Sequence, residues 1–126
     1  MSLRTGPLKV RAQIFAGDEI AMGPGKADLL EAIEREGSIS AAGRSLGMSY
    51  RRSWELVDTM NRCWAERLVE TVPGGGRDRG AHVSEMGREV LALYRELERQ
   101  LLGSAAGQDF TRLKGLLRDP PAPRNY

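Results

Sequence analysis

The sequence predicts a mainly α-helical fold with a small amount of β-structure: a winged helix-turn-helix with an N-terminal β-hairpin and a long C-terminal helix. Three observations predict this fold. Two short helical segments are separated by a glycine-containing turn at 47–48, a glycine-rich segment lies between two short strands at 68–84, and a long helical segment follows. We assign residues 1–103 to this domain and expect the tail, residues 104–126, to be partly disordered.

The N-terminal strands are predicted from residues 8–22. Apolar Val10, Ala12 and Ile14 alternate with polar side chains, which is the pattern of a strand with one buried face. A turn at Gly17 would join this strand to the next. We therefore expect one β-hairpin before the first helix.

Each of the next three helices is marked by a residue that favours a helix end. The first helix covers about 26–36, and Gly37 ends it. Ser38 or Ser40 is the N-cap of a short second helix, and Ser49 is the N-cap of a third helix that reaches about residue 63. On the third helix we expect an inward apolar stripe of Tyr50, Trp54, Val57 and Asn61.

The segment 68–84 is predicted to be a hairpin that forms the wing. Strands at 68–72 and 81–84 flank a glycine-rich tip, residues 73–80. Ser84 then begins a fourth helix that extends to about Leu102, with the acidic Glu85 in its first turn.

The fourth helix carries two apolar stripes, so we expect it to pack on two bodies. Val90, Leu93, Leu97 and Leu101 form one stripe. The second stripe consists of Leu91, Tyr94 and Leu102, and we predict that it forms the interface of a homodimer.

The helix-turn-helix makes the N-terminal end of the third helix the candidate DNA-binding site, because this end can enter the major groove of double-stranded DNA. Arginine can bind guanine bidentately, while hydroxyl groups and a helix N-terminus can bind phosphate oxygens. Ala41 and Ala42 would let the two helices approach closely. The candidate DNA-binding residues are Ser49, Tyr50, Arg51, Arg52 and Ser53 on the third helix, Arg44 on the second helix, and Arg77 and Arg79 on the wing.

Residues 37–61, GSISAAGRSLGMSYRRSWELVDTMN, resemble the helix-turn-helix of LysR-type regulators. They resemble more closely the N-terminal domain of molybdate-responsive regulators of the ModE type. The likeness continues through Leu68–Glu70, the glycine-rich wing, 84–87 and 93–94, and covers about residues 8–100. The resemblance implies a winged-helix domain that dimerises largely through helices and reads DNA with its third helix.

Several classes of function are disfavoured by the composition. One cysteine, Cys63, and one histidine, His82, cannot supply a four-ligand zinc site of nitrogen and sulfur within one chain, and we expect no metal, cofactor or catalytic residue. No apolar run is long enough to cross a membrane, so we expect a cytoplasmic protein without membrane contact. The family's molybdate-sensing domains have no counterpart here, so we expect no molybdate binding. Whether the chain works with a separate sensor protein is left open.

The prediction is thus a sequence-specific transcriptional regulator and not an enzyme. The alternative is a winged-helix module that mediates protein–protein contacts and has no affinity for DNA. The net charge of +2 does not discriminate between the two functions, because many proteins with other functions have this charge. The four arginines at 51, 52, 77 and 79 favour DNA.

Overall fold

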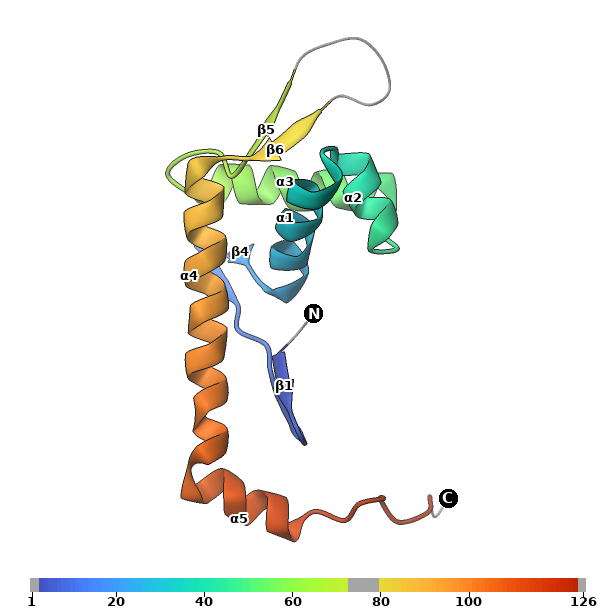
Figure 1. Cartoon of the computed structure of the whole chain (residues 1–126), viewed down its shortest axis with the longest axis vertical. Coiled ribbons are helices and arrows are strands. Elements are labelled where there is room, and N and C mark those ends of the chain that lie inside the picture. Colours follow the sequence, from blue (N-terminus) through green and yellow to red (C-terminus); the bar gives the residue numbers. More distant parts are fainter. Residues whose placement is uncertain (1–2, 73–79, 125–126) are drawn as a thin grey trace.

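The computed structural model describes residues 3–72 and 80–124. It confirms the predicted fold class, because helices dominate, the strands form small antiparallel pairs, and a long helix follows the wing strands (Figure 1). The helical body lies at one end of the molecule, and the long helix α4 (Glu85–Leu102) extends away from it.

Two β-hairpins, and not the single predicted one, precede the first helix. The predicted hairpin forms from β3 (Ile14–Ala16) and β4 (Glu19–Met22), with Gly17 in the left-handed conformation at its turn. A further hairpin, β1 (Leu3–Thr5) with β2 (Leu8–Val10), turns at Gly6-Pro7. This Gly-Pro dipeptide is itself a turn signal that the sequence reading did not use.

The first three helices begin and end close to the predicted residues. They are α1 (Pro24–Glu36), α2 (Ile39–Ser45) and α3 (Tyr50–Cys63). Gly37 ends α1 with φ +77°, and its N–H donates to the carbonyl of Ile33 over 2.8 Å. The hydroxyl of Ser38 accepts a hydrogen bond from Ala41 N at the start of α2.

Helix α1 is the centre of the hydrophobic core. Leu29, Leu30 and Ile33 are fully buried, and the helix packs on α2, α3 and α4. The core continues through α3, the wing strands and α4, so that one cluster joins all of the helical body. The helix-turn-helix therefore stands on a rigid support.

The wing strands are β5 (Val69–Thr71) and β6 (Ala81–Val83), which pair antiparallel. They are shorter than predicted, and Arg77 and Arg79 lie outside the described residues. Gly87 in the first turn of α4 packs directly against this hairpin. A Cβ added at Gly87 would lie 2.4 Å from the carbonyl oxygen of Leu68. Only glycine allows this approach.

The predicted dimer stripe of α4 is wrong for two of its three residues. Leu91 and Tyr94 are buried within their own chain, and the Tyr94 hydroxyl donates to the carbonyl of Ala12 over 2.6 Å. The other predicted stripe is divided: Val90 is buried and Leu97 is half-buried, whereas Leu93 and Leu101 are exposed. The reason is that the β1–β2 hairpin and α1 cover the Tyr94 side of the helix, which the sequence pattern did not show.

A partly buried arginine joins α4 to α1. The guanidinium of Arg95 forms ion pairs with Asp28 over 2.7 Å, with Glu98 on its own helix over 2.8 Å, and with Glu31. The Glu98 side chain is completely buried. These pairs fix α4 beside α1.

The predicted tail contains two elements. They are the 3-10 helix η1 (Gly103–Ala106) and α5 (Gln108–Leu116), neither of which the sequence reading predicted. Leu113, Leu116 and Leu117 are exposed in this segment. Figure 1 shows α5 at the end of α4 that is far from the helix-turn-helix.

Candidate nucleic-acid interface

Helices α2 and α3 approach each other so closely that a glycine is required between them. Gly43 is buried, and a Cβ added there would lie 2.0 Å from the Ser53 hydroxyl oxygen. The turn also depends on Gly47, which has φ +71°, and on a 2.8 Å hydrogen bond from Met48 N to the Gly43 carbonyl. Although Ala42 is buried as expected, Gly43 makes the close contact, and the sequence reading did not identify it.

This contact corrects the prediction for Ser53, which is wrong as a surface residue. Ser53 is completely buried, and its hydroxyl donates to the Ser49 carbonyl over 3.0 Å. A side chain in this position cannot reach DNA. Its role is to let α2 pack on α3.

The other predicted residues on the first turn of α3 are exposed together. Ser49 is the N-cap, and its hydroxyl accepts a 3.0 Å hydrogen bond from Arg52 N. Tyr50 is 66% exposed, and the Arg51 side chain is 90% exposed. Arg52 and, on α2, Arg44 are exposed as well.

The inward stripe of α3 is rotated from the prediction. Ser53, Leu56, Val57 and Met60 are buried, whereas Tyr50 is exposed and Trp54 is half-buried. The rings of Tyr50 and Trp54 lie 6.1 Å apart between centroids. The prediction was wrong here because it favoured the large aromatic side chains over the small Ser53, and the close approach of α2 requires the small one.

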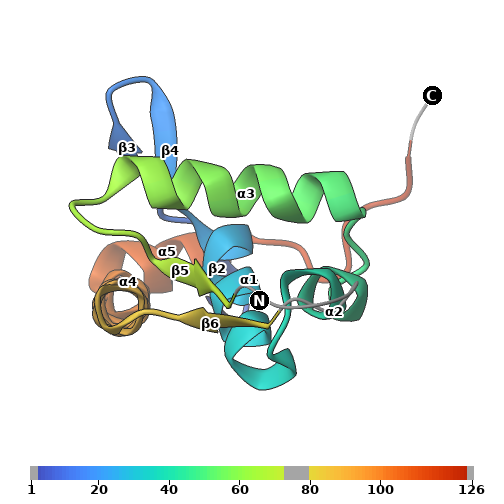
Figure 2. The ribbon, with the colours of Figure 1, turned by 90° about the horizontal axis from the view of Figure 1, so that it is seen from above.

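Ion pairs restrain two arginines on the outward face of α3. Arg51 Nε donates to Glu55 over 3.0 Å. Arg62 donates to both carboxylate oxygens of Glu19, over 2.7 and 2.8 Å, and to Asp58 over 2.9 Å. The hydrogen bond from Arg62 holds the pKa of Glu19 below its usual value. These contacts place β4 against the C-terminal half of α3, as Figure 2 shows.

The wing is tied to the end of α3 by one amide side chain. Asn61 Oδ1 accepts hydrogen bonds from Leu68 N and Val69 N, and its Nδ2 donates to the Val69 carbonyl, over 2.9 to 3.1 Å. At the other edge, Ala81 N donates to the Gly37 carbonyl over 2.8 Å. The stem of the wing is therefore fixed to both α3 and the end of α1.

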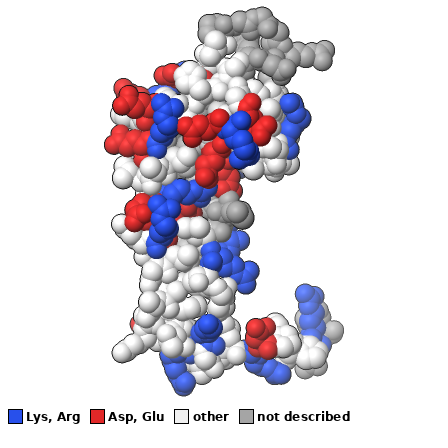
Figure 3. Space-filling model, in the orientation of Figure 1, with Lys and Arg blue, Asp and Glu red and all other residues white. Residues whose placement is uncertain are grey.

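Charges of both signs are interspersed over the helical body in the view of Figure 3, and basic side chains lie along the α4–α5 end. Within residues 3–72 and 80–124, no group of three or more histidine, cysteine or acidic side chains could hold a metal ion. No described helix is long and apolar enough to cross a membrane.

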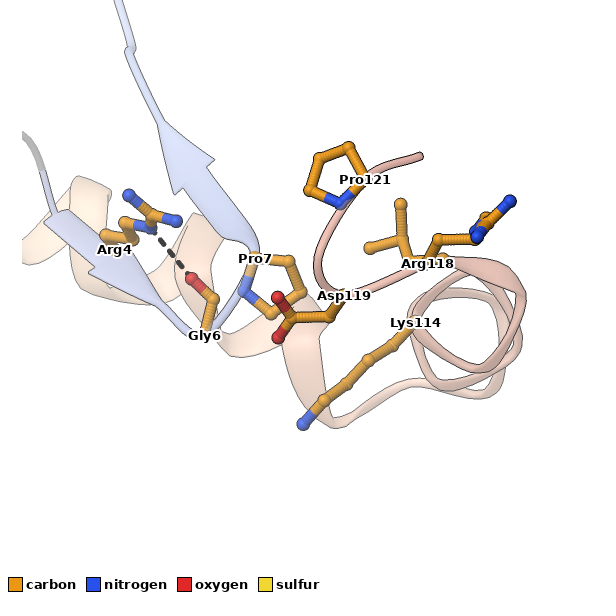
Figure 4. A pocket seen from close by; sticks show the side chains of 8 residues that line it. Arg4, Gly6, Pro7, Lys114, Arg118, Asp119 and Pro121 are labelled. Atoms are coloured by element: carbon orange, nitrogen blue, oxygen red, sulfur yellow. Dashed lines mark hydrogen bonds between the residues drawn. The ribbon is translucent and has the colours of Figure 1, made fainter. Parts of the chain in front are cut away.

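A hollow of about 610 Å³ lies between the β1–β2 turn and the C-terminal segment. Figure 4 shows Arg4 and Gly6 on the hairpin side and Asp119 and Lys114 on the other. Arg4 donates to the Gly6 carbonyl over 2.8 Å, and Arg118 points away from the hairpin. The cations around this hollow thus do not converge on one point, as an anion site would require.

Comparison with known proteins identifies relatives of this chain, although no family model matches it. A molybdenum transport protein ModE of Azotobacter vinelandii is 47% identical over 70 residues, which are 56% of this chain and 26% of the relative. The chain is a homologue of the ModE regulators. The DNA-binding transcriptional dual regulator ModE of Escherichia coli K12 is 32% identical over 87 residues, which are 69% of this chain and 31% of the relative.

A further relative is the molybdenum-pterin-binding protein MopA of Rhodobacter capsulatus, 43% identical over 70 residues, or 56% of this chain and 26% of the relative. The chain spans about a quarter of the length of these first relatives. The names of the ModE relatives are those of regulators and transport proteins, and none of them names an enzyme.

Proposed function

We propose that this chain is a sequence-specific, DNA-binding transcriptional regulator of the ModE type, with α3 in the major groove. The observation that carries the proposal is the exposed first turn of α3. The buried contact between Gly43 and Ser53 holds this turn, and Tyr50, Arg51 and Arg52 project outward from it. The name of the Escherichia coli relative, a DNA-binding regulator, supports the same function.

The β5–β6 hairpin is the wing in this proposal, and its tip contacts the DNA backbone or the minor groove. Asn61 supports this role, because it ties the stem of the wing to the same helix that enters the major groove. Arg77 and Arg79 would add positive charge at the tip.

The proposed assembly is a homodimer through the outward leucines of α4, Leu93, Leu97 and Leu101, extended by the exposed leucines of α5. An apolar stripe of this kind is covered in most proteins, and a second copy covers it symmetrically. The two recognition helices would then bind half-sites about one helical turn, or a multiple of it, apart.

We further propose that the described residues do not bind molybdate. The molybdenum in the names of the relatives belongs to proteins of which this chain covers 26% to 35%. The basic side chains around the hollow in Figure 4 do not converge on one point, as a site for a free oxyanion would require. Calorimetry should detect no sub-micromolar binding of molybdate or tungstate, and such binding would contradict the proposal.

A protein–protein interaction module is the second candidate function. One observation favours it: Glu55 and Asp58 neutralise two arginines on the outward face of α3, so this face is less positive than that of a helix without acids. The two functions predict different results in a binding experiment.

The experiment is selection of bound fragments from a genomic DNA library, followed by gel shifts on the enriched sequence. We expect enrichment of a sequence with two-fold symmetry. The R51A/R52A double variant should lose the preference for this sequence over random DNA. If no sequence is enriched, and if the double variant binds DNA as the unmodified chain does, the protein–protein function is correct instead.

A further inference from the structure

Two cations beside α3 have a different environment from the paired arginines. Arg51 and Arg62 are ion-paired, but in the part of the chain that the structure describes neither Arg52 nor Lys26 forms an ion pair or a hydrogen bond through its charged group. Lys26 lies in the first turn of α1, and both residues line one groove of about 490 Å³ along the flank of α3. Carboxylates line this groove as well: Glu55 is paired with Arg51, Glu19 and Asp58 are paired with Arg62, and Asp18 lies beside them.

The two cations are close enough to repel each other. Burial lowers the pKa of the Lys26 amine, and the positive charge of Arg52 lowers it further. The carboxylates of Glu19, Glu55 and Asp58 are paired with Arg51 or Arg62, so among the described residues neither Lys26 nor Arg52 has an ion-pair partner that offsets this repulsion. An anion between the two side chains would relieve it and would be held by charge-assisted hydrogen bonds from both.

The position of each arginine on α3 separates their roles. Arg51 shares the outward face with Glu55, Asp58 and Arg62, which follow it by four, seven and eleven residues. Arg52 lies one position further round the helix, with Leu56 and Thr59, on the α1 side of a groove whose other side is lined by Glu55, Asp58 and Arg62. When a helix lies in the major groove, its outward face meets the base edges and its flank meets the phosphates of the groove wall.

Glu55 distinguishes Arg51 from Arg52 in a second way. Its carboxylate accepts from Nε of Arg51 over 3.0 Å, which leaves both terminal nitrogens of the guanidinium free. Such a fixed guanidinium can present its terminal nitrogens to guanine O6 and N7. Arg52 has no such restraint, and its partner across the groove is another cation.

We propose that Arg51, positioned by Glu55, reads a base edge, and that Arg52 and Lys26 together hold one phosphate of the DNA backbone. This inference rests on the proposed DNA-binding function. It extends the binding surface from the helix-turn-helix to the first turn of α1, which the sequence analysis did not include.

The test measures binding of five proteins to the selected site and to random DNA across a salt series: the unmodified chain, K26A, R52A, K26A/R52A and R51A. K26A and R52A should each weaken binding to both DNAs by a similar factor. The double variant should lower the slope of log K against log salt by about 0.9, the value for one phosphate, and not by twice that amount. R51A should weaken only the specific complex, by about 5- to 150-fold.

Two controls complete the experiment. K9A removes a lysine charge from the β1–β2 hairpin and should bind both DNAs as the unmodified chain does. E55Q should bind random DNA more tightly, because a negative charge is lost, but should discriminate less between the two DNAs, because Arg51 is no longer held. A purely structural role of Glu55 would not produce these opposite changes.

The outcomes separate this inference from the proposed function. If the unmodified chain binds no DNA, both fail. If it binds a specific site but K26A leaves affinity and salt slope unchanged, or if R52A rather than R51A loses specificity, the inference is overturned and the proposed function stands.

Discussion

At the scale of single residues, the geometry of the helix-turn-helix depends on the absence of a side chain at position 43. Any Cβ there must displace the Ser53 hydroxyl, which is 2.0 Å away, and that hydroxyl is itself engaged with the Ser49 carbonyl. A change at Gly43 should therefore alter the packing of α2 on α3 and, through Ser49, the start of α3.

The first prediction concerns this contact. Gly43→Ala should destabilise the protein by about 1–3 kcal/mol, because overpacking a close contact forces the helices apart. Ser53→Ala alone should cost about 1 kcal/mol for the lost hydrogen bond. The double variant should recover part of the loss, because the hydroxyl that clashes is gone. Urea unfolding of all three variants measures these free energies.

The matched control is Gly25→Ala. Gly25 is also a helical glycine, but an added Cβ there has open space within 4 Å. The substitution should be neutral or stabilising, because alanine restricts the unfolded chain. Equal destabilisation by the two alanine variants would show that the Gly43 contact has no special role.

The second prediction concerns Tyr94 and pH. Burial, and then the negative charge of Glu98, raises the pKa of Tyr94 to about 12 from the usual 10.0. Below pH 10 the hydroxyl is protonated in both the folded and the unfolded chain, and its contribution to stability is fully present. As the pH rises from 10 to 12, only the unfolded chain releases this proton, so the free energy of unfolding should fall.

Tyr94→Phe should remove this pH dependence, although it also loses the hydrogen bond to Ala12 and about 1 kcal/mol of stability at neutral pH. Thermal unfolding of both proteins between pH 9 and 12 tests this. A variant that loses stability with pH as steeply as the unmodified chain would show that Tyr94 is not the group responsible.

Residues with local signals were predictable, and residues defined by tertiary contacts were not. Ser49 and Gly37 were identified because capping depends on neighbours in the sequence. Gly43 was missed because its role comes from an unusually close approach of two helices, and Lys26 was missed because its proposed role depends on α3, which is distant in the chain.

At the scale of the elements, α3 joins the two parts of the proposed DNA-binding surface. Its first turn carries the exposed arginines, and near its end Asn61 satisfies three backbone groups of the segment 68–69. Asn61 is therefore the side chain that connects the β5–β6 hairpin to α3, while Ala81 connects the hairpin to the end of α1. The sequence reading placed Asn61 in an inward stripe but did not reveal this role.

The third prediction tests this connection. Asn61→Ala should destabilise the protein by about 2–4 kcal/mol, because two backbone N–H groups lose their acceptor in a part-buried position. Asn61→Asp keeps an acceptor for both N–H groups and should cost less. Urea unfolding gives the free energies, and hydrogen exchange at Leu68 and Val69 should be fastest in the alanine variant. Equal exchange rates in all three proteins would contradict this role.

The packing of α4 shows the same limit of prediction from sequence. The period of apolar residues in α4 revealed two stripes, but periodicity does not state which stripe meets the chain's own core. The β1–β2 hairpin decides this, because it packs on the Tyr94 side. That hairpin was not predicted, so Leu91 and Tyr94 were assigned to a dimer interface, although they are buried within the chain.

At the scale of the whole molecule, α4 separates the proposed DNA-binding surface from the proposed dimer interface. The helix-turn-helix and the wing lie at one end of α4, while Leu97, Leu101 and the α5 leucines lie toward the other (Figure 1). In a dimer that uses this face, the distance between the two recognition helices depends on how the two α4 helices pack. Dimerisation would thus determine the half-site spacing.

The last prediction tests the dimer with a pair of charge-matched variants. Leu93 is 64% exposed and Leu101 is 44% exposed, so glutamate at both positions should not disturb the core of the monomer. L93E/L101E should sediment as a monomer at tens of micromolar, where the unmodified chain should be a dimer, because buried glutamates would lose hydration in the interface. The control A92E/R99Q changes the net charge by the same two units on the polar face of α4, where positions 92 and 99 lie two turns apart, and should remain dimeric. The monomeric variant should also bind a full two-fold operator more weakly than the control but a single half-site equally well. A monomeric unmodified chain, or a control that dissociates as readily as L93E/L101E, would show that this leucine face is not the interface.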